Sequence, residues 1–151
     1  MNRKEKLLGE ILIKKGLLSV KQLENALDAQ EKTKEFLGSI LLARDLIKEK
    51  DLLEALSEQF DIPFITIQYK YIDWDFIRGF SPSLILDYKC FPFKKDNGSV
   101  TVAITNPLDA WALEKVEQET KGFRLSLALV TEEDMREAIR RYEEYIQKKY
   151  L

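Results

Sequence analysis

The sequence predicts an α+β protein: an all-helical tandem-repeat bundle over residues 1–61, followed by a small α/β subdomain with a mixed sheet over residues 62–151. Two observations support this prediction. First, Leu8–Gln30 recurs 29 residues later as Leu37–Gln59, with ten identities in 23 aligned positions and no gap. Second, the helical periodicity gives way after Pro63 to short strand-like runs and a hairpin turn. Because two copies are too few for a solenoid, we expect a pseudo-twofold pair of helical hairpins.

Each copy of the repeat predicts two short helices joined by a bend. The first helix of the first copy should stop at Gly16, and Ser19 with Gln22 forms a capping-box pattern for the second. In the second copy, Asp45 stands where Gly16 stands in the first. From the apolar positions at helical spacing we expect helices over Lys4–Lys15, Val20–Lys32, Phe36–Arg44 and Lys48–Phe60.

The second half predicts short helices and strands. Phe64–Tyr71 alternates apolar and polar positions and predicts a short strand or an extended link. Asp96-Asn97-Gly98 is a strong hairpin turn between two strand-like runs. We expect strands over Cys90–Lys95, Ser99–Thr105 and Phe123–Val130, and helices over Asp73–Arg78, Pro82–Tyr88, about 110–120 and about 132–149. The helix between the last two strands predicts a right-handed crossover.

Composition excludes several classes of protein. The 24 basic and 26 acidic residues are spread along the chain, which argues against a nucleic-acid partner. No apolar run approaches the ~20 residues that a transmembrane helix needs, and the N-terminus lacks the apolar core of a signal peptide. The single cysteine, Cys90, cannot form an internal disulfide and suits a reducing compartment. We therefore expect a cytoplasmic protein.

The residue types of an active site are largely missing. The chain has no histidine, which removes the commonest general base and metal ligand. Cys90 lies in an apolar run and is expected in the core, since no histidine can activate it. No Gly-x-x-x-x-Gly-Lys-Ser/Thr loop is present to hold phosphates. The sequence thus predicts a protein that is not an enzyme, with neither catalytic nor metal-binding residues.

The repeat carries polar and flexible residues at unusual positions. Gln30 and Gln59 lie on the apolar stripe of their helices, where a buried amide needs hydrogen-bond partners. Gly9 and Gly38 lie inside helical patterns, where glycine costs ~1 kcal/mol relative to alanine. One interpretation is close packing between hairpins, with each glutamine bonded to a loop carbonyl. The other is that the glycines give a ligand access to the backbone.

The doubled pattern Leu-Gly-x-x-Leu-x-x-x-Gly, then Leu-x-x-x-Leu-x-x-Gln, resembles the MshEN cyclic di-GMP-binding domain. That domain forms the N-terminal part of assembly ATPases in type II secretion and type IV pilus systems. The resemblance continues through Cys90–Phe93, Val100–Asp109 and Thr131–Tyr142, so it covers nearly the whole chain. The ATPase portion is absent, which implies a freestanding copy or a fragment.

The resemblance implies a ligand and a site. In that family a twofold-symmetric dinucleotide lies across the tandem motifs, so cyclic di-GMP is the implied ligand and no cofactor is required. The implied partner protein is a secretion or pilus assembly ATPase or platform protein. Carried across residue by residue, the implied ligand-binding residues are Leu8, Gly9, Leu12, Leu27, Gln30, Leu37, Gly38, Leu41, Leu56 and Gln59.

One departure from the family pattern leaves an alternative open. The family motif begins Arg-Leu-Gly, whereas this chain has Leu7 at the arginine position. Leucine cannot replace a planar, bidentate cation, and the loss of such a contact is on the order of 1.5–3 kcal/mol. We therefore expect a cyclic di-GMP-responsive regulatory module. The alternative is an adaptor of the same fold that docks to a secretion or pilus component without binding nucleotide.

Overall fold

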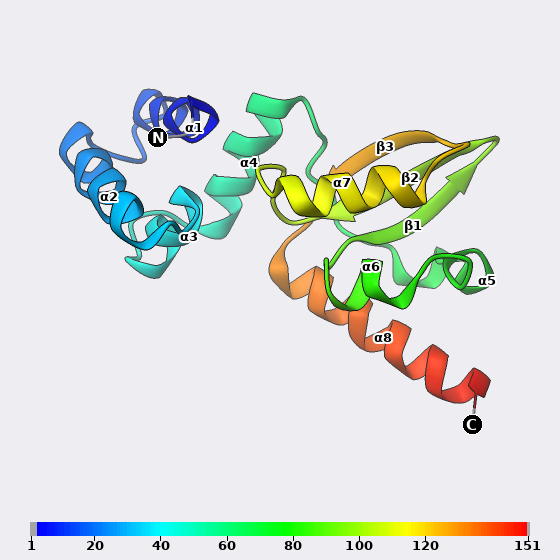
Figure 1. Cartoon of the computed structure of the whole chain (residues 1–151). Coiled ribbons are helices and arrows are strands. Elements are labelled where there is room, and N and C mark those ends of the chain that lie inside the picture. The colour runs from blue at the N-terminus through cyan, green and yellow to red at the C-terminus, as the bar shows by residue number, and fades with distance from the viewer. Residues whose placement is uncertain (1–2, 151) are drawn as a thin grey trace. The chain divides into compact units, whose positions relative to one another are not determined.

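The structure is a computed structural model that describes residues 3–150. The chain forms two compact units, Met1–Asp61 (unit 1) and Ile62–Leu151 (unit 2). Within its described residues unit 1 contains only helices, as the sequence predicts, and unit 2 combines helices with a sheet. Figure 1 shows the order of these elements along the chain.

Unit 1 contains four helices that correspond closely to the expected ones: α1 (Arg3–Lys14), α2 (Val20–Thr33), α3 (Leu37–Ala43) and α4 (Glu49–Phe60). The first helix of each repeat packs against the second helix of the other, since α1 contacts α4 and α2 contacts α3. The two hairpins therefore pack reciprocally, and the expected pseudo-twofold pair is present.

The two bends inside the repeats are built in the same way. The Leu17 N–H donates to the Leu12 carbonyl at 3.0 Å, and the Leu46 N–H donates to the Leu41 carbonyl at 3.0 Å. Both bends need one residue with positive φ, which is 77° at Gly16 and 55° at the equivalent aspartate. Aspartate tolerates this left-handed conformation better than most residues. The second bend thus forms without glycine.

The starts of the helices differ more than their ends. Ser19 caps α2 with the predicted capping box, whereas Lys48, its equivalent, gives α4 no side-chain cap. Helix α1 begins five residues earlier relative to the repeat than α3, because Phe36 is the extended N-cap residue of α3. The repeat is therefore symmetric in its packing and less so at its N-terminal edges.

Unit 2 contains the expected mixed sheet, which has three strands in the order β1–β2–β3. Strand β2 pairs antiparallel with β1 and parallel with β3. The turn between β1 and β2 uses positive φ at Asn97 (37°) and Gly98 (81°). The elements are α5 (Trp74–Ile77), α6 (Pro82–Leu86), β1 (Phe91–Asp96), β2 (Ser99–Ile104), α7 (Ala110–Glu119), β3 (Arg124–Leu129) and α8 (Glu132–Tyr150).

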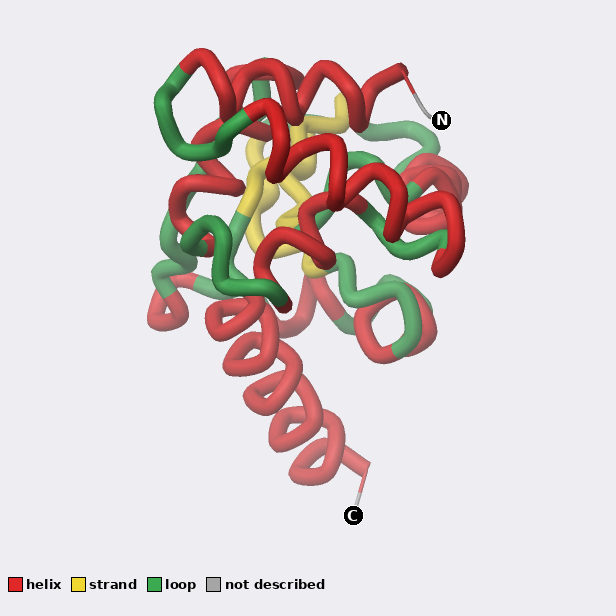
Figure 2. Tube along the Cα trace, turned by 90° about the vertical axis from the view of Figure 1, so that its left-hand side faces the viewer, coloured by secondary structure: helices red, strands yellow, loops and turns green. Residues whose placement is uncertain are grey.

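Helices cover the sheet of unit 2. In Figure 1 α7 lies in front of the strands and α8 runs below them, while Figure 2 shows the C-terminal part of α8 extending away from the strands. The buried cluster beneath α8 joins Phe91 and Ala103 of the sheet to Met135, Ala138 and Tyr142 of the helix. Sheet and helix thus share one hydrophobic core.

Cys90 is buried as expected, with 1% of its surface exposed. Burial raises the pKa of its thiol to about 12, with the nearby Asp109 carboxylate adding to the shift. A thiol with this pKa is not a nucleophile at neutral pH. The structure therefore supports a packing role for Cys90.

The segment Phe64–Tyr71 is not the strand that its alternation allowed. A single parallel bridge joins Phe64 to Leu129, and Tyr69–Tyr71 form a 3-10 helix, η1. The remainder is an extended link, and the bonds to β3 at its start involve only Leu129, the last residue of that strand. Its register is set by the Ile65 N–H donating to the Leu129 carbonyl at 2.9 Å.

Within the described part of the chain, no helix is long and apolar enough to cross a membrane.

Candidate functional site

The apolar candidate residues lie mainly in the interior of unit 1. Leu27 is half-buried, and the other five leucine side chains are 0–3% exposed. In this structure these five side chains pack in the core between the helices, and their part in ligand binding stays a prediction. The buried candidates are Leu8, Leu12, Leu37, Leu41 and Leu56.

The two candidate glycines are buried against a leucine of their own hairpin. A Cβ atom at Gly9 would lie 2.5 Å from Leu23 Cδ1, and one at Gly38 would lie 2.9 Å from Leu52 Cδ2. Leu23 and Leu52 are themselves equivalent positions of the repeat. The glycines therefore allow the two helices of each hairpin to approach closely. Of the two interpretations of these glycines, this contact agrees with close packing, here within each hairpin, and access for a ligand stays a prediction.

The two candidate glutamines link the repeats to each other. Gln30 Nε2 donates to the Glu35 carbonyl at 3.1 Å, just before α3. Gln59 Nε2 donates to the Lys4 carbonyl at 2.9 Å, in the first turn of α1. Each glutamine thus holds the start of the first helix of the other repeat. This agrees with the packing interpretation of the sequence.

One polar atom of these glutamines lacks a partner. Gln59 Oε1 is buried, and within the described residues no hydrogen-bond donor reaches it. A buried carbonyl oxygen without a donor costs on the order of 1–3 kcal/mol. A hydrogen bond donated to this oxygen by a polar ligand would remove that cost.

Glu5 is a residue that the sequence analysis missed. Its side chain is 6% exposed, and its Oε1 accepts a hydrogen bond from the Leu37 N–H at 3.0 Å. This bond joins the start of α1 to the start of α3. A signal was present in the sequence, because Glu5 lies on the same helical stripe as Leu8 and Leu12. A carboxylate on that stripe indicates a buried acceptor.

The hydrogen bonds of the two glutamines and Glu5 bring four helix ends together. They connect the C-terminal end of α4, the N-terminal ends of α1 and α3, and the C-terminal end of α2. Two exposed apolar residues lie within two residues of these bonds along the chain: Leu7 at 43% exposure and Phe36 at 38%. They are equivalent positions of the repeat. We call this surface the junction.

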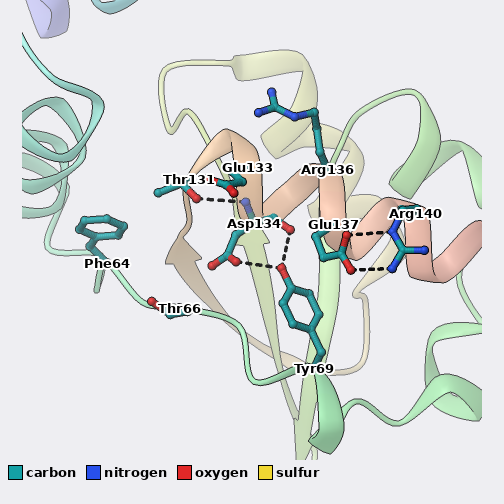
Figure 3. A pocket seen from close by; sticks show the side chains of 9 residues that line it. All are labelled: Phe64, Thr66, Tyr69, Thr131, Glu133, Asp134, Arg136, Glu137 and Arg140. Atoms are coloured by element: carbon teal, nitrogen blue, oxygen red, sulfur yellow. Dashed lines mark hydrogen bonds and ion pairs between the residues drawn. The ribbon is translucent and has the colours of Figure 1, made fainter.

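Unit 2 has a separate pocket of about 540 Å³, drawn in Figure 3. Its Asp134 carboxylate accepts hydrogen bonds from the Tyr69 hydroxyl at 2.8 Å and from the Ile67 N–H at 3.2 Å. Burial and this bond to Asp134 raise the pKa of the Tyr69 hydroxyl. Hydrogen bonds and charge from Arg140 and Arg141 lower the pKa of Glu137 to about 2.

The polar groups of this pocket are thus largely paired with one another. Figure 3 shows the Arg140–Glu137 pair and the Tyr69–Asp134 pair side by side along α8. The bonds from Ile67 and Tyr69 to Asp134 fasten η1 and the link before it to the start of α8, whereas the Arg140–Glu137 pair lies within α8. Among the described residues, no group of three histidine, cysteine or acidic side chains could hold a metal ion. The hydrogen bonds and ion pairs of this pocket therefore mainly stabilise the fold of unit 2.

Comparisons with known proteins place the chain in a family. A family model, the MshEN domain, matches residues 60–147, which is more than half of the chain. Type IV pilus assembly ATPase PilB of Myxococcus xanthus is 29% identical over 135 residues. That match covers 89% of this chain and 24% of the relative, so the chain spans about a quarter of the length of PilB.

Solved structures share the fold. MshE with cdg (cyclic di-GMP) matches with a TM-score of 0.81 and 24% identity, over 89% of this chain and 97% of that one. The N-terminal domain of XpsE matches with a TM-score of 0.70 and 19% identity, over 94% and 97%. Each match covers more of the chain than unit 2 contains, so both include part of the tandem repeat. The chain belongs to the MshEN domain family.

Proposed function

We propose that this chain is a cytoplasmic regulatory module of a type II secretion or type IV pilus system, and that it binds cyclic di-GMP across its two helical hairpins. Membership of the MshEN domain family and similarity to part of a pilus assembly ATPase support the first part. The fold match to MshE, solved with cdg, supports the second. The proposed ligand-binding residues are those of the tandem motif.

The observation that carries this proposal is the reciprocal arrangement of the repeats. Equivalent glutamines, Gln30 and Gln59, hold the starts of opposite repeats, so the junction has an approximate twofold relation between its halves. Cyclic di-GMP is itself twofold symmetric. A symmetric ligand placed on the junction would meet similar groups with each of its halves.

The accessible groups define how a ligand could be held there. Because five of the candidate leucines and both glycines are buried, contact falls to the half-buried Leu27 and glutamines. Each glutamine keeps one free N–H of its amide and an acceptor oxygen. Guanine presents both donors and acceptors on its edge. Gln59 Oε1, which is buried and has no donor among the described residues, would pair with a guanine N–H once its side chain turns outward.

A second candidate function is favoured by one observation. Leu7 at the motif arginine position, with Phe36 at the equivalent position, makes the junction apolar where the family carries charge. An exposed apolar pair also suits a protein partner. On this alternative the chain is an adaptor that docks to a secretion or pilus component and binds no nucleotide.

Isothermal titration with cyclic di-GMP distinguishes the two functions. We expect one dinucleotide per chain, with weaker binding by Gln30→Ala and by Gln59→Ala, because each variant removes an amide from one half of the site. Gln147→Ala, a glutamine exposed on α8, is the matched control and should bind as the wild type does. If no heat appears at high protein and nucleotide concentrations, the adaptor function stands in place of the proposed one.

A further inference from the structure

Unit 2 has a second pocket, of about 490 Å³, between β1 and the segment of residues 64–71. This volume lies within the range of pockets that hold small molecules. We call it the β1 recess, and its lining is Ile65, Thr66, Gln68, Tyr71, Phe93 and Lys94. Two of these side chains, Ile65 and Phe93, are half-buried and pack against the buried core of unit 2. The apolar part of the recess is therefore an edge of the core that the chain leaves partly uncovered.

An irregularity in β1 brings two neighbouring residues to this recess. Consecutive residues of a regular strand point to opposite faces of the sheet, so only one of two neighbours normally lines a given pocket. The pairing of β1 with β2 shifts register between Pro92 and Lys94, which leaves Phe93 without a register partner on β2. Phe93 and Lys94 both line the recess as a result. Bulges of this kind re-aim side chains and are frequent beside functional sites.

The polar groups of the β1 recess differ from those of the pocket beside α8, which are largely paired with one another. The side chains of Thr66, Gln68 and Lys94 form no hydrogen bond or ion pair within the described part of the chain. None of the lining residues carries a carboxylate. The Lys70 ammonium lies 5.0 Å from the centre of the Tyr71 ring, which is itself exposed. The recess thus combines positive charge and available hydrogen-bonding groups with an apolar surface.

We propose that the β1 recess binds a small aromatic carboxylate. The ring of the ligand lies against Ile65 and Phe93, and the exposed ring of Tyr71 adds a second aromatic contact. The Lys94 ammonium, which has no carboxylate partner among the described residues, pairs with the carboxylate of the ligand, and the Gln68 amide donates to it. This site lies within unit 2 and does not rest on the binding of cyclic di-GMP proposed for unit 1.

Amide chemical shifts recorded while 2-naphthoate is added test this site. 2-Naphthoate is a flat aromatic carboxylate, and 2-naphthamide, its neutral counterpart of nearly the same shape, is the control ligand. We expect naphthoate to shift the amides of residues 65–71 and 93–94, with a dissociation constant on the order of 1 mM for a ligand of this size. Naphthamide should bind at the same place about threefold more weakly, because it lacks the charge that Lys94 attracts.

Variants of exposed residues assign the roles within the recess. Lys94→Gln should weaken naphthoate binding about threefold and leave naphthamide binding unchanged, because it removes only the charge. Lys95→Gln is the matched control, since Lys95 is also exposed but does not line the recess, and it should retain wild-type affinity. Tyr71→Ala should weaken the binding of both ligands about fivefold. Trp111→Ala removes an exposed ring that does not line the recess and should weaken neither.

Several results would overturn the proposal. Naphthoate shifts confined to other parts of the chain, or no shifts at millimolar concentrations, would show that the recess is not a site. Equal affinities of naphthoate and naphthamide, or equal affinities of Lys94→Gln and Lys95→Gln for naphthoate, would show that it does not select an anion. Circular dichroism of each variant checks that the fold is retained. Calorimetry with cyclic di-GMP is a separate measurement, so failure of this proposal is distinguishable from failure of the proposed function.

Discussion

Replacing Glu5 by alanine should loosen the connection between the two repeats. The carboxylate is 6% exposed and accepts the Leu37 N–H at 3.0 Å, so the variant leaves a buried donor without a partner. A hydrogen bond to a charged group contributes about 1.5–3 kcal/mol, and keeping a carboxylate buried offsets part of that. Helix α3 has only seven residues and cannot form without such support. We expect a loss of about 2 kcal/mol in the free energy of unfolding.

Urea denaturation followed by circular dichroism at 222 nm measures this loss. With a slope on the order of 1 kcal/mol per molar urea for a unit of this size, the midpoint should fall by about 2 M. Trp74 and Trp111 both lie in unit 2, so their fluorescence reports that unit separately. If the units unfold independently, the fluorescence midpoint should not move.

Two further variants serve as controls for Glu5→Ala. Glu5→Gln keeps an acceptor oxygen and should lose less stability than the alanine variant. Glu10→Ala removes an exposed carboxylate from the same helix and should leave the midpoint unchanged. If Glu5→Ala unfolds at the wild-type urea concentration, α3 is positioned by apolar packing alone and the hydrogen bond contributes nothing.

Three other predictions follow from the structure. Leu7→Arg should tighten cyclic di-GMP binding in calorimetry, about tenfold for each 1.4 kcal/mol regained; unchanged affinity would show that the arginine position is irrelevant here. Gly9→Ala should lower the free energy of unfolding by about 1 kcal/mol in urea denaturation, because its Cβ atom would lie 2.5 Å from Leu23 Cδ1 and overpacking exceeds the gain in helix propensity. Burial raises the pKa of Glu119, but hydrogen bonds from Ser81 and Lys115 lower it more, so the net pKa lies below its ordinary value. Its contribution to stability is therefore present above about pH 4.3 and is lost as the pH falls further, so fluorescence-monitored urea curves of wild type and Glu119→Gln should converge in acid.

Local signals in the sequence predicted most of the secondary structure. Gly16 marks a bend because its φ of 77° suits glycine, and Asp109 accepts a capping bond from the Ala112 N–H at 3.1 Å at the start of an expected helix. Asn97-Gly98 forms the hairpin turn as expected. Such features depend on a few neighbouring residues, so a single sequence contains the information. The boundaries of the elements accordingly differ from the expected ones by only a few residues.

Long-range contacts account for what the sequence did not predict. Phe64–Tyr71 alternates like a strand, but the Ile67 N–H binds the Asp134 carboxylate, 67 residues away, instead of a neighbouring strand. The sequence left close packing and ligand access both open for Gly9, because it does not reveal that Leu23 lies against this glycine. Both outcomes were decided by residues from another helix.

For the candidate site, too, the sequence predicted some features, and others could be seen only in the folded structure. The repeat indicated that Gln30 and Gln59 are special, and the structure adds that their amides bind carbonyls at the starts of opposite repeats. The distinction between buried leucines and the exposed pair Leu7 and Phe36 needed the packed helices, since all of them are apolar in sequence. Ligand binding by the tandem motif stays a prediction.

Amide chemical shifts measured during a titration with cyclic di-GMP test the central claim most directly. The account predicts shifts in both repeats, around residues 3–9 and 34–38 and near Gln30 and Gln59, that saturate at one dinucleotide per chain. Guanosine monophosphate, which is half of the ligand, should produce much weaker shifts at the same sites. Shifts confined to one repeat or to residues 62–148, or no shifts at all, would contradict a dinucleotide held across the two hairpins.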